Sequence, residues 1–255
     1  MDKENARLPV ESLFYKNLPS QFVMAENAVE WLLLREYGSV FVAKGVIAPR
    51  TVVFTGDVDV LAYQAALSKM SAKIGLSDLE LQAPAMESLL GCIADADSQH
   101  LTITPRGADS ARRSYIETVD LWKSRVHPAL AHWTKEGNLS IMEAERILAL
   151  SPFEQVPEIF KLEAEGMWFA KDLSKSIIYS VAPPGTSQHL SMLALDIKEH
   201  EDEKVRVIMA GGYWYQTVTS DLPHFTYLGA AESDLDGFGL NRVTDNGRPF
   251  WIPDI

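Results

Sequence analysis

Apolar positions in the first hundred residues recur mostly at helical spacing. Residues 25–38, AENAVEWLLLREYG, carry apolar side chains on one helical face and end at a glycine, which predicts a helix. Residues 57–71 and 78–94 each start near an acidic residue and continue as amphipathic patterns, so we expect two further helices there. The β-branched runs VFVA (40–43) and TVVF (51–54) predict two short strands that pair with each other.

The pattern changes after residue 100. LTIT (101–104) predicts a strand, which a proline and a glycine then interrupt. Asp109 or Ser110 can cap a long helix over 110–126. A helical region interrupted by a proline follows at 127–150.

The last third of the chain is richer in strands. MLALDI (192–197) predicts a buried strand, and YWYQTV (213–218) and HFTYLG (224–229) predict two more. EDEKVRVIMAGG (201–212) predicts a helix that ends at a glycine pair. We therefore expect an α+β fold, with a mostly antiparallel sheet packed with helices in the C-terminal half.

Few residues with catalytic side chains occur in the first part of the chain. We expect residues 1–95 to form a largely helical accessory lobe and residues 96–255 to form the core that carries the chemistry.

Charge and composition narrow the range of partners and locations. The chain has 23 Lys and Arg against 35 Asp and Glu, a net charge of −12, which argues against nucleic acid and anionic membrane surfaces as partners. No apolar run is long enough to span a membrane. The first residues lack the apolar region of a secretory signal, so we expect a cytoplasmic protein, or a cell-envelope or secreted protein if a leader has been removed. The single cysteine, Cys92, is expected to be a buried structural thiol.

Two of the six histidines stand out. His189 and His224 both lie in strand-rich segments, with Asp196 seven residues after the first and Asp221 three residues before the second. Histidine and aspartate are common ligands of a catalytic zinc, which takes three protein ligands and a water. The other four histidines are expected to be structural: His100, His127, His132 and His200.

A shared ion at His189 and Asp196 makes a demand on the backbone. In a straight helix or strand, positions seven apart lie about 10 or more than 20 Å from each other. The chain must therefore bend between them, and PGTS (184–187) just upstream favours a turn. The alternative is a core histidine near a solvated aspartate, with no metal.

These residues resemble a known signature. The motif S-x-H-x-x-G-x-A-x-D followed by E-x-x-H is typical of the zinc D-alanyl-D-alanine carboxypeptidase and dipeptidase family, with its VanY-like and VanX-like members. The hedgehog N-terminal domain shares their fold. Ser187, His189 and Asp196 match the first motif, and Asp221 with His224 matches the second. The resemblance implies that His189, Asp196 and His224 bind Zn²⁺ and that Asp221 is the general base.

In that family an arginine stabilises the oxyanion, and two candidates occur here. Arg106 follows the expected strand, as the family arginine does, whereas the residues around Arg113 resemble the family's local sequence S-G-Y-R-S-Y. Because Arg113 is expected inside a helix, Arg106 is favoured. Ser187 is expected to help hold the substrate.

Three positions depart from the signature: Met192 replaces glycine, Asp221 replaces glutamate, and Pro223 replaces tryptophan. The function implied by the resemblance is a zinc metallopeptidase that hydrolyses short peptides ending in D-alanine, such as peptidoglycan stem peptides. The alternatives are a catalytically divergent zinc- or peptide-binding module of the same fold, and a scaffold without metal.

Overall fold

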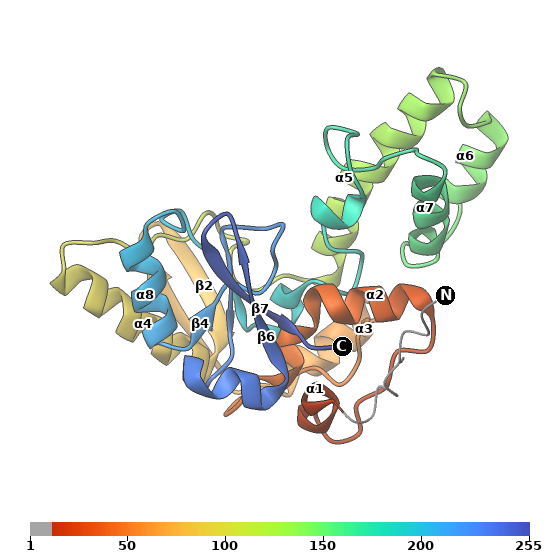
Figure 1. Ribbon diagram of the computed structural model, residues 1–255. Coiled ribbons are helices and arrows are strands. Elements are labelled where there is room, and N and C mark those ends of the chain that lie inside the picture. Colours follow the sequence, from red (N-terminus) through yellow and green to blue (C-terminus); the bar gives the residue numbers. More distant parts are fainter. Residues whose placement is uncertain (1–11) are drawn as a thin grey trace.

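The computed structural model describes residues 12–255 (Figure 1). Its α-helices are α1 (Leu13–Asn17), α2 (Ala28–Tyr37), α3 (Asp57–Ala65), α4 (Ala83–Ser98), α5 (Tyr115–Lys135), α6 (Ile141–Leu148), α7 (Gln155–Ala164) and α8 (Glu203–Gly211). Its 3₁₀ helices are η2 (Gly38–Val42), η3 (Ile177–Tyr179), η4 (Gln188–Ser191) and η5 (Glu232–Phe238). Its strands are β1 (Lys69–Ile74), β2 (Ser77–Gln82), β3 (Ala194–Asp196), β4 (Trp214–Tyr215), β5 (His224–Tyr227), β6 (Leu240–Asp245) and β7 (Arg248–Pro253). Among the described residues, no helix combines the length and apolar character that crossing a membrane requires.

The strands form three antiparallel units. β3, β5 and β4 make a three-stranded sheet in that order, and β1–β2 and β6–β7 are hairpins. The backbone N–H of Trp251 in β7 donates to Gln216, which follows β4, and so joins the second hairpin to the sheet. The predicted α+β class is confirmed, and so are the strands expected within 192–197, 213–218 and 224–229.

Two hydrophobic cores divide the molecule differently from the expected boundary at residue 95. The larger core takes side chains from the N-terminal helices and from the C-terminal sheet, among them Leu33, Leu89, Leu195 and Phe225, all at most 1% exposed. Each such side chain contributes about 1.5–3 kcal/mol when buried. Residues 1–95 are therefore not a separate lobe, because their described part shares one core with the sheet.

The second core lies in a helical lobe that projects from the main body (Figure 1). Helices α5, α6 and α7 bury side chains between them, including Trp122, Ile147 and Ile159. The Trp122 indole N–H donates to the Gln155 side chain inside this core, at 3.0 Å. This lobe is inserted between the two parts of the chain that build the main core.

Several expected elements of the N-terminal part differ. Residues 40–43 lie mostly in the 3₁₀ helix η2, and residues 51–54 pair only at one bridge, between Thr51 and Val23. Their apolar side chains serve burial in the core, not strand pairing. The helices expected at 57–71 and 78–94 are interrupted by the β1–β2 hairpin, which turns at Gly75 with φ +60. Glycine favours this two-residue turn because positive φ costs it little.

Helix α5 begins later and runs further than its pattern predicted. Ser114, not Asp109 or Ser110, is the N-cap, and it forms a capping box with Glu117. The helix then continues through Pro128 to Lys135. The preceding segment, 105–113, contains bends and a turn and lies beside β3, and Pro105 bridges Ile197 antiparallel. Residues 101–104 do not form the predicted strand, and the bridge lies at the residue that follows them.

Candidate metal centre

Strand register places two of the predicted ligands side by side. Asp196, the last residue of β3, pairs directly with His224, the first residue of β5. Directly opposed residues of antiparallel strands point to the same face of a sheet, with Cβ atoms about 5 Å apart. The sheet therefore brings the two side chains together, although 28 positions separate them in the sequence.

A bend brings in the third ligand, as the spacing demanded. His189 lies in η4, and the chain then reverses at Met192, whose φ of 58 and ψ of 31 are left-handed. This conformation is uncommon for a residue with a side chain. Full burial of the Met192 side chain in the protein offsets part of its cost. The bend is confirmed at the position where the signature has glycine.

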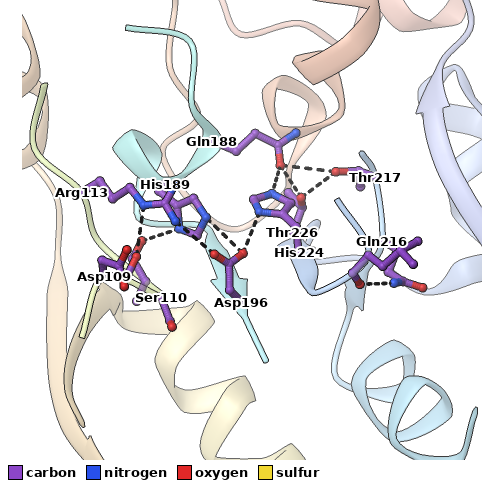
Figure 2. A network of polar contacts seen from close by, with 12 residues as sticks. Asp109, Ser110, Arg113, Gln188, His189, Asp196, Gln216, Thr217, His224 and Thr226 are labelled. Atoms are coloured by element: carbon purple, nitrogen blue, oxygen red, sulfur yellow. Dashed lines mark hydrogen bonds and ion pairs between the residues drawn. The ribbon is translucent and has the colours of Figure 1, made fainter. Parts of the chain in front are cut away.

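Three ligand atoms converge at the floor of a pocket (Figure 2). His189 Nε2 lies 3.3 Å and His224 Nδ1 lies 3.1 Å from the same oxygen, Oδ1 of Asp196. Ligands at zinc–ligand distances of about 2.1 Å in a tetrahedron lie roughly 3.4 Å apart. All three residues are at most 6% exposed. The buried cluster can hold a metal ion, since all three ligand atoms lie within 4.8 Å of one another.

The remaining polar atom of each ligand is held by a partner. His189 Nδ1 lies 2.7 Å from the carbonyl oxygen of Ala111, and His224 Nε2 lies 2.8 Å from the side-chain oxygen of Gln188. Asp196 Oδ2 accepts a hydrogen bond from Arg113 at 3.0 Å. Partners of this kind orient metal ligands and select the histidine tautomer.

The orientation of the Gln188 amide is itself fixed. Its nitrogen donates to the Tyr37 carbonyl, while its oxygen accepts from the hydroxyl groups of Thr217 and Thr226. The group facing His224 is therefore an acceptor, and His224 must carry its proton on Nε2. The carbonyl of Ala111 likewise requires the proton of His189 on Nδ1.

Neutral histidines in these tautomers direct lone pairs toward a carboxylate oxygen. Burial lowers the pKa of His189, which favours the neutral ring. Burial raises the pKa of Asp196, but the charge and hydrogen bonds that His189 and His224 supply when protonated outweigh it and hold that pKa well below its usual value. When the two rings are neutral, three acceptor atoms face one another, an arrangement that suits a metal ion.

The cluster opens into a pocket of about 240 Å³. Ser187 lies beside the ligands and is 8% exposed, whereas Asp221 and Arg106 are exposed at the edge. The Asp221 backbone carbonyl accepts from the N–H of His224, which ties the aspartate to a ligand three residues later. All the predicted site residues therefore line one pocket.

The expected helix-interior position of Arg113 is wrong. It precedes the N-cap of α5, in the segment beside β3, because the capping box starts the helix at Tyr115. Its guanidinium donates to Asp196 and to the backbone oxygen of Asp109, so it is committed to the floor of the pocket. The Arg106 backbone N–H donates to the Asp196 carbonyl, while its side chain forms no hydrogen bond or ion pair with any described residue. Their positions relative to the helix therefore no longer decide which of Arg106 and Arg113 is the better candidate for stabilising the oxyanion.

Two residues of the pocket were not anticipated. Gln188 is the variable position inside the motif, and nothing in its sequence context shows that it contacts His224. Arg125 lines the pocket from the inserted lobe, one helical turn after Leu121, which also lines it. Recognition of the capping box at Ser114 in the sequence would have placed the start of α5 correctly, and so the helical face that carries Leu121 and Arg125. Cys92 is buried as predicted, and burial raises its pKa to about 11.

Comparison with known proteins returned no relative: neither a protein-family model, nor a curated protein, nor a solved structure matches this chain.

Proposed function

We propose that the protein is a zinc metallopeptidase that hydrolyses short peptides ending in D-alanine, of the peptidoglycan type. The observation that carries the proposal is the donor set of the pocket floor. Two histidine nitrogens lie 3.3 and 3.1 Å from one carboxylate oxygen, which matches the separation of two ligands of tetrahedral zinc, and each residue is oriented by a further hydrogen bond. The resemblance of Ser187–Asp196 and Asp221–His224 to the D-alanyl-D-alanine carboxypeptidase signature supports the substrate class.

The chemistry follows from which groups share the pocket. His189, Asp196 and His224 would hold the zinc ion, which would supply polarisation of the scissile carbonyl and a water whose pKa is lowered toward about 7. Asp221, exposed at the pocket edge, takes the proton of the attacking water as general base. Arg106, whose guanidinium has no partner among residues 12–255, stabilises the developing oxyanion. Ser187, beside His189, helps position the substrate.

A second function is favoured by one observation. Asp221 is one methylene shorter than the glutamate of the signature, and its side chain makes no hydrogen bond or ion pair with the three ligands. A catalytically divergent module that binds zinc or peptide, without turnover, fits this departure. Both functions require the metal centre, so they differ only in the role of Asp221.

Release of D-alanine from acetylated peptides tests the proposal. Zinc-loaded protein should release D-alanine, and Asp221→Asn should lower the rate by about 100- to 10,000-fold, the usual contribution of a general base. The bound zinc should stay the same in this variant. If Asp221→Asn turns over as fast as the parent, the aspartate is not the base. If zinc-loaded parent releases nothing, the binding module is the better account.

A further inference from the structure

The guanidinium of Arg125 has no carboxylate partner in an otherwise acidic protein. Its Nε donates to the Ser180 hydroxyl oxygen at 3.0 Å and its Nη1 to Ser124 at 2.9 Å. Among the described residues it forms no ion pair. The chain as a whole has a net charge of −12, so partners for a cation are plentiful elsewhere. Arg125 therefore presents unused N–H donors to the pocket that it lines.

Ser180 adds a second donor at the same place. Its oxygen accepts from Arg125 and from the backbone N–H of Lys171, while its own hydroxyl proton has no acceptor among the described residues. Ser180 also lines the pocket. An N–H of Arg125 and the O–H of Ser180 are thus both free to bind a two-oxygen acceptor. A carboxylate matches this pair of donors in both charge and geometry.

Arg125 approaches the pocket from a different element than the metal ligands do. It lies ten residues, about 15 Å of rise, after Tyr115, the first residue of α5. Side chains on a helix lean toward its N-terminus, so the guanidinium reaches back along the pocket wall, past Leu121. The three ligands come from η4, β3 and β5, whereas Arg125 enters the pocket from the inserted lobe. Arg125 can therefore hold a group of the substrate other than the scissile carbonyl.

We propose that Arg125 and Ser180 recognise a carboxylate of the substrate, separate from the scissile carbonyl, and that they make this pocket selective for peptides that carry it. The inference rests on the proposed function, since it names a substrate group for the same pocket. It assigns a binding role to the inserted helical lobe, because Arg125 belongs to α5 and Ser180 follows η3. Two groups of a peptide offer this chemistry: the free C-terminal carboxylate and an acidic side chain.

Three acetylated peptides distinguish these sources. The first has a glutamate residue and a free C-terminal D-alanine, the second has the same sequence with an amidated C-terminus, and the third replaces the glutamate by glutamine. Their dissociation constants are measured by calorimetry on zinc-loaded Asp221→Ala protein, in which turnover is suppressed. Kinetic constants for the same peptides are measured on the parent.

The variants are Arg125→Gln, Arg125→Lys and a matched control, Lys123→Gln. Lys123 is exposed on the same helix and lies outside the pocket, so its loss removes one positive charge without removing a pocket donor. Arg125→Gln should raise the dissociation constant of the first peptide about 10- to 100-fold, the range for a hydrogen bond to a charged group. It should act on KM more than on kcat. Arg125→Lys should recover part of the loss, and Lys123→Gln should change little.

The carboxylate that Arg125 binds is identified by the difference in dissociation constant between peptides that disappears in Arg125→Gln. Loss of discrimination between the first and second peptides assigns the C-terminal carboxylate, and loss between the first and third assigns the side chain. If none of the peptides binds, or if Arg125→Gln weakens all three equally, the inference is wrong. If the binding pattern holds but the parent hydrolyses none of the peptides, the carboxylate site stands and the peptidase proposal fails.

Discussion

His224 donates its Nε2 proton to the side-chain oxygen of Gln188, 2.8 Å away, and this contact decides which nitrogen faces Asp196. Four polar groups depend on that one amide: His224, Thr217 and Thr226 donate to its oxygen, and its nitrogen donates to Tyr37. The amide is 3% exposed, so water does not replace these partners. The metal-binding form of His224 is therefore set before any ion arrives.

Replacement of Gln188 tests this relationship. Gln188→Leu removes the acceptor and leaves a buried histidine N–H unpaired, so zinc affinity should fall about 10- to 100-fold. Gln188→Glu keeps an acceptor oxygen toward His224 and should retain more affinity than the leucine variant. Competition with a chelating dye measures both. Equal affinity in parent and Gln188→Leu would show that His224 needs no such orientation.

The ion pair of Arg113 with Asp196 predicts a large effect on stability. The two side chains are 15% and 9% exposed, and removing one partner of a buried pair costs about 3–5 kcal/mol. Arg113→Gln should lower the free energy of unfolding of metal-free protein by about this amount, measured in urea. The control is Arg35→Gln, whose pair with Glu36 is exposed and worth about 0–1 kcal/mol. Similar losses in both variants would refute the structural role of Arg113.

Two glycines with the same φ angle test how closely the segment before His189 packs against Phe54. Gly185 and Gly137 both have φ +79, but a Cβ on Gly185 would lie 2.0 Å from the carbonyl oxygen of Phe54, whereas Gly137 has open space. Gly137→Ala should cost about 1–2 kcal/mol for its left-handed angle. Gly185→Ala should cost more and should also weaken zinc binding, because it displaces the segment that leads to His189. Equal unfolding free energies for the two variants would contradict the close approach.

The buried carboxyl of Glu163 predicts a pH dependence in the helical lobe. Burial raises its pKa above the ordinary value of 4.5, although the carboxyl accepts hydrogen bonds from Ser176 and from Ile177. A raised pKa in the folded state stabilises the protein below the ordinary value, and this contribution is lost as pH rises through the raised value. Glutamine at this position does not titrate. The unfolding free energy of the parent, minus that of Glu163→Gln, should therefore fall as the pH rises above the ordinary value of 4.5 and through the raised pKa of Glu163. A difference that stays constant would mean that the carboxyl titrates normally.

The sequence indicated the metal centre better than it indicated the fold around it. Side-chain type and spacing made His189, Asp196 and His224 candidates but left a core histidine without metal as the alternative, and the family resemblance implied the full ligand set. The bend at Met192 followed from the distance that a shared ion allows. No local signal identified Gln188, since a contact across the sheet depends on tertiary packing.

The N-terminal half was harder because its β1–β2 hairpin has little apolar alternation. KMSAKI alternates between exposed and half-buried positions along most of its length, so its pattern is weak, and the glycine turn was the stronger signal. The start of α5 was misplaced by about five residues, although Ser114 and Glu117 have the spacing of a capping box. Because of that error, Arg113 was predicted to lie inside a helix, and the helical face that carries Arg125 was not recognised as part of the pocket.

The most direct test of the account is elemental analysis of protein purified without chelator, next to His189→Ala. The structure places His189 Nε2 within 3.3 Å of the carboxylate oxygen that it would share an ion with, so its loss removes one of three ligands. We predict close to one zinc per parent chain and little in the variant, with both proteins folded by circular dichroism. Parent protein that is metal-free and takes up no added zinc would contradict the metal centre, and the peptidase proposal would fall with it.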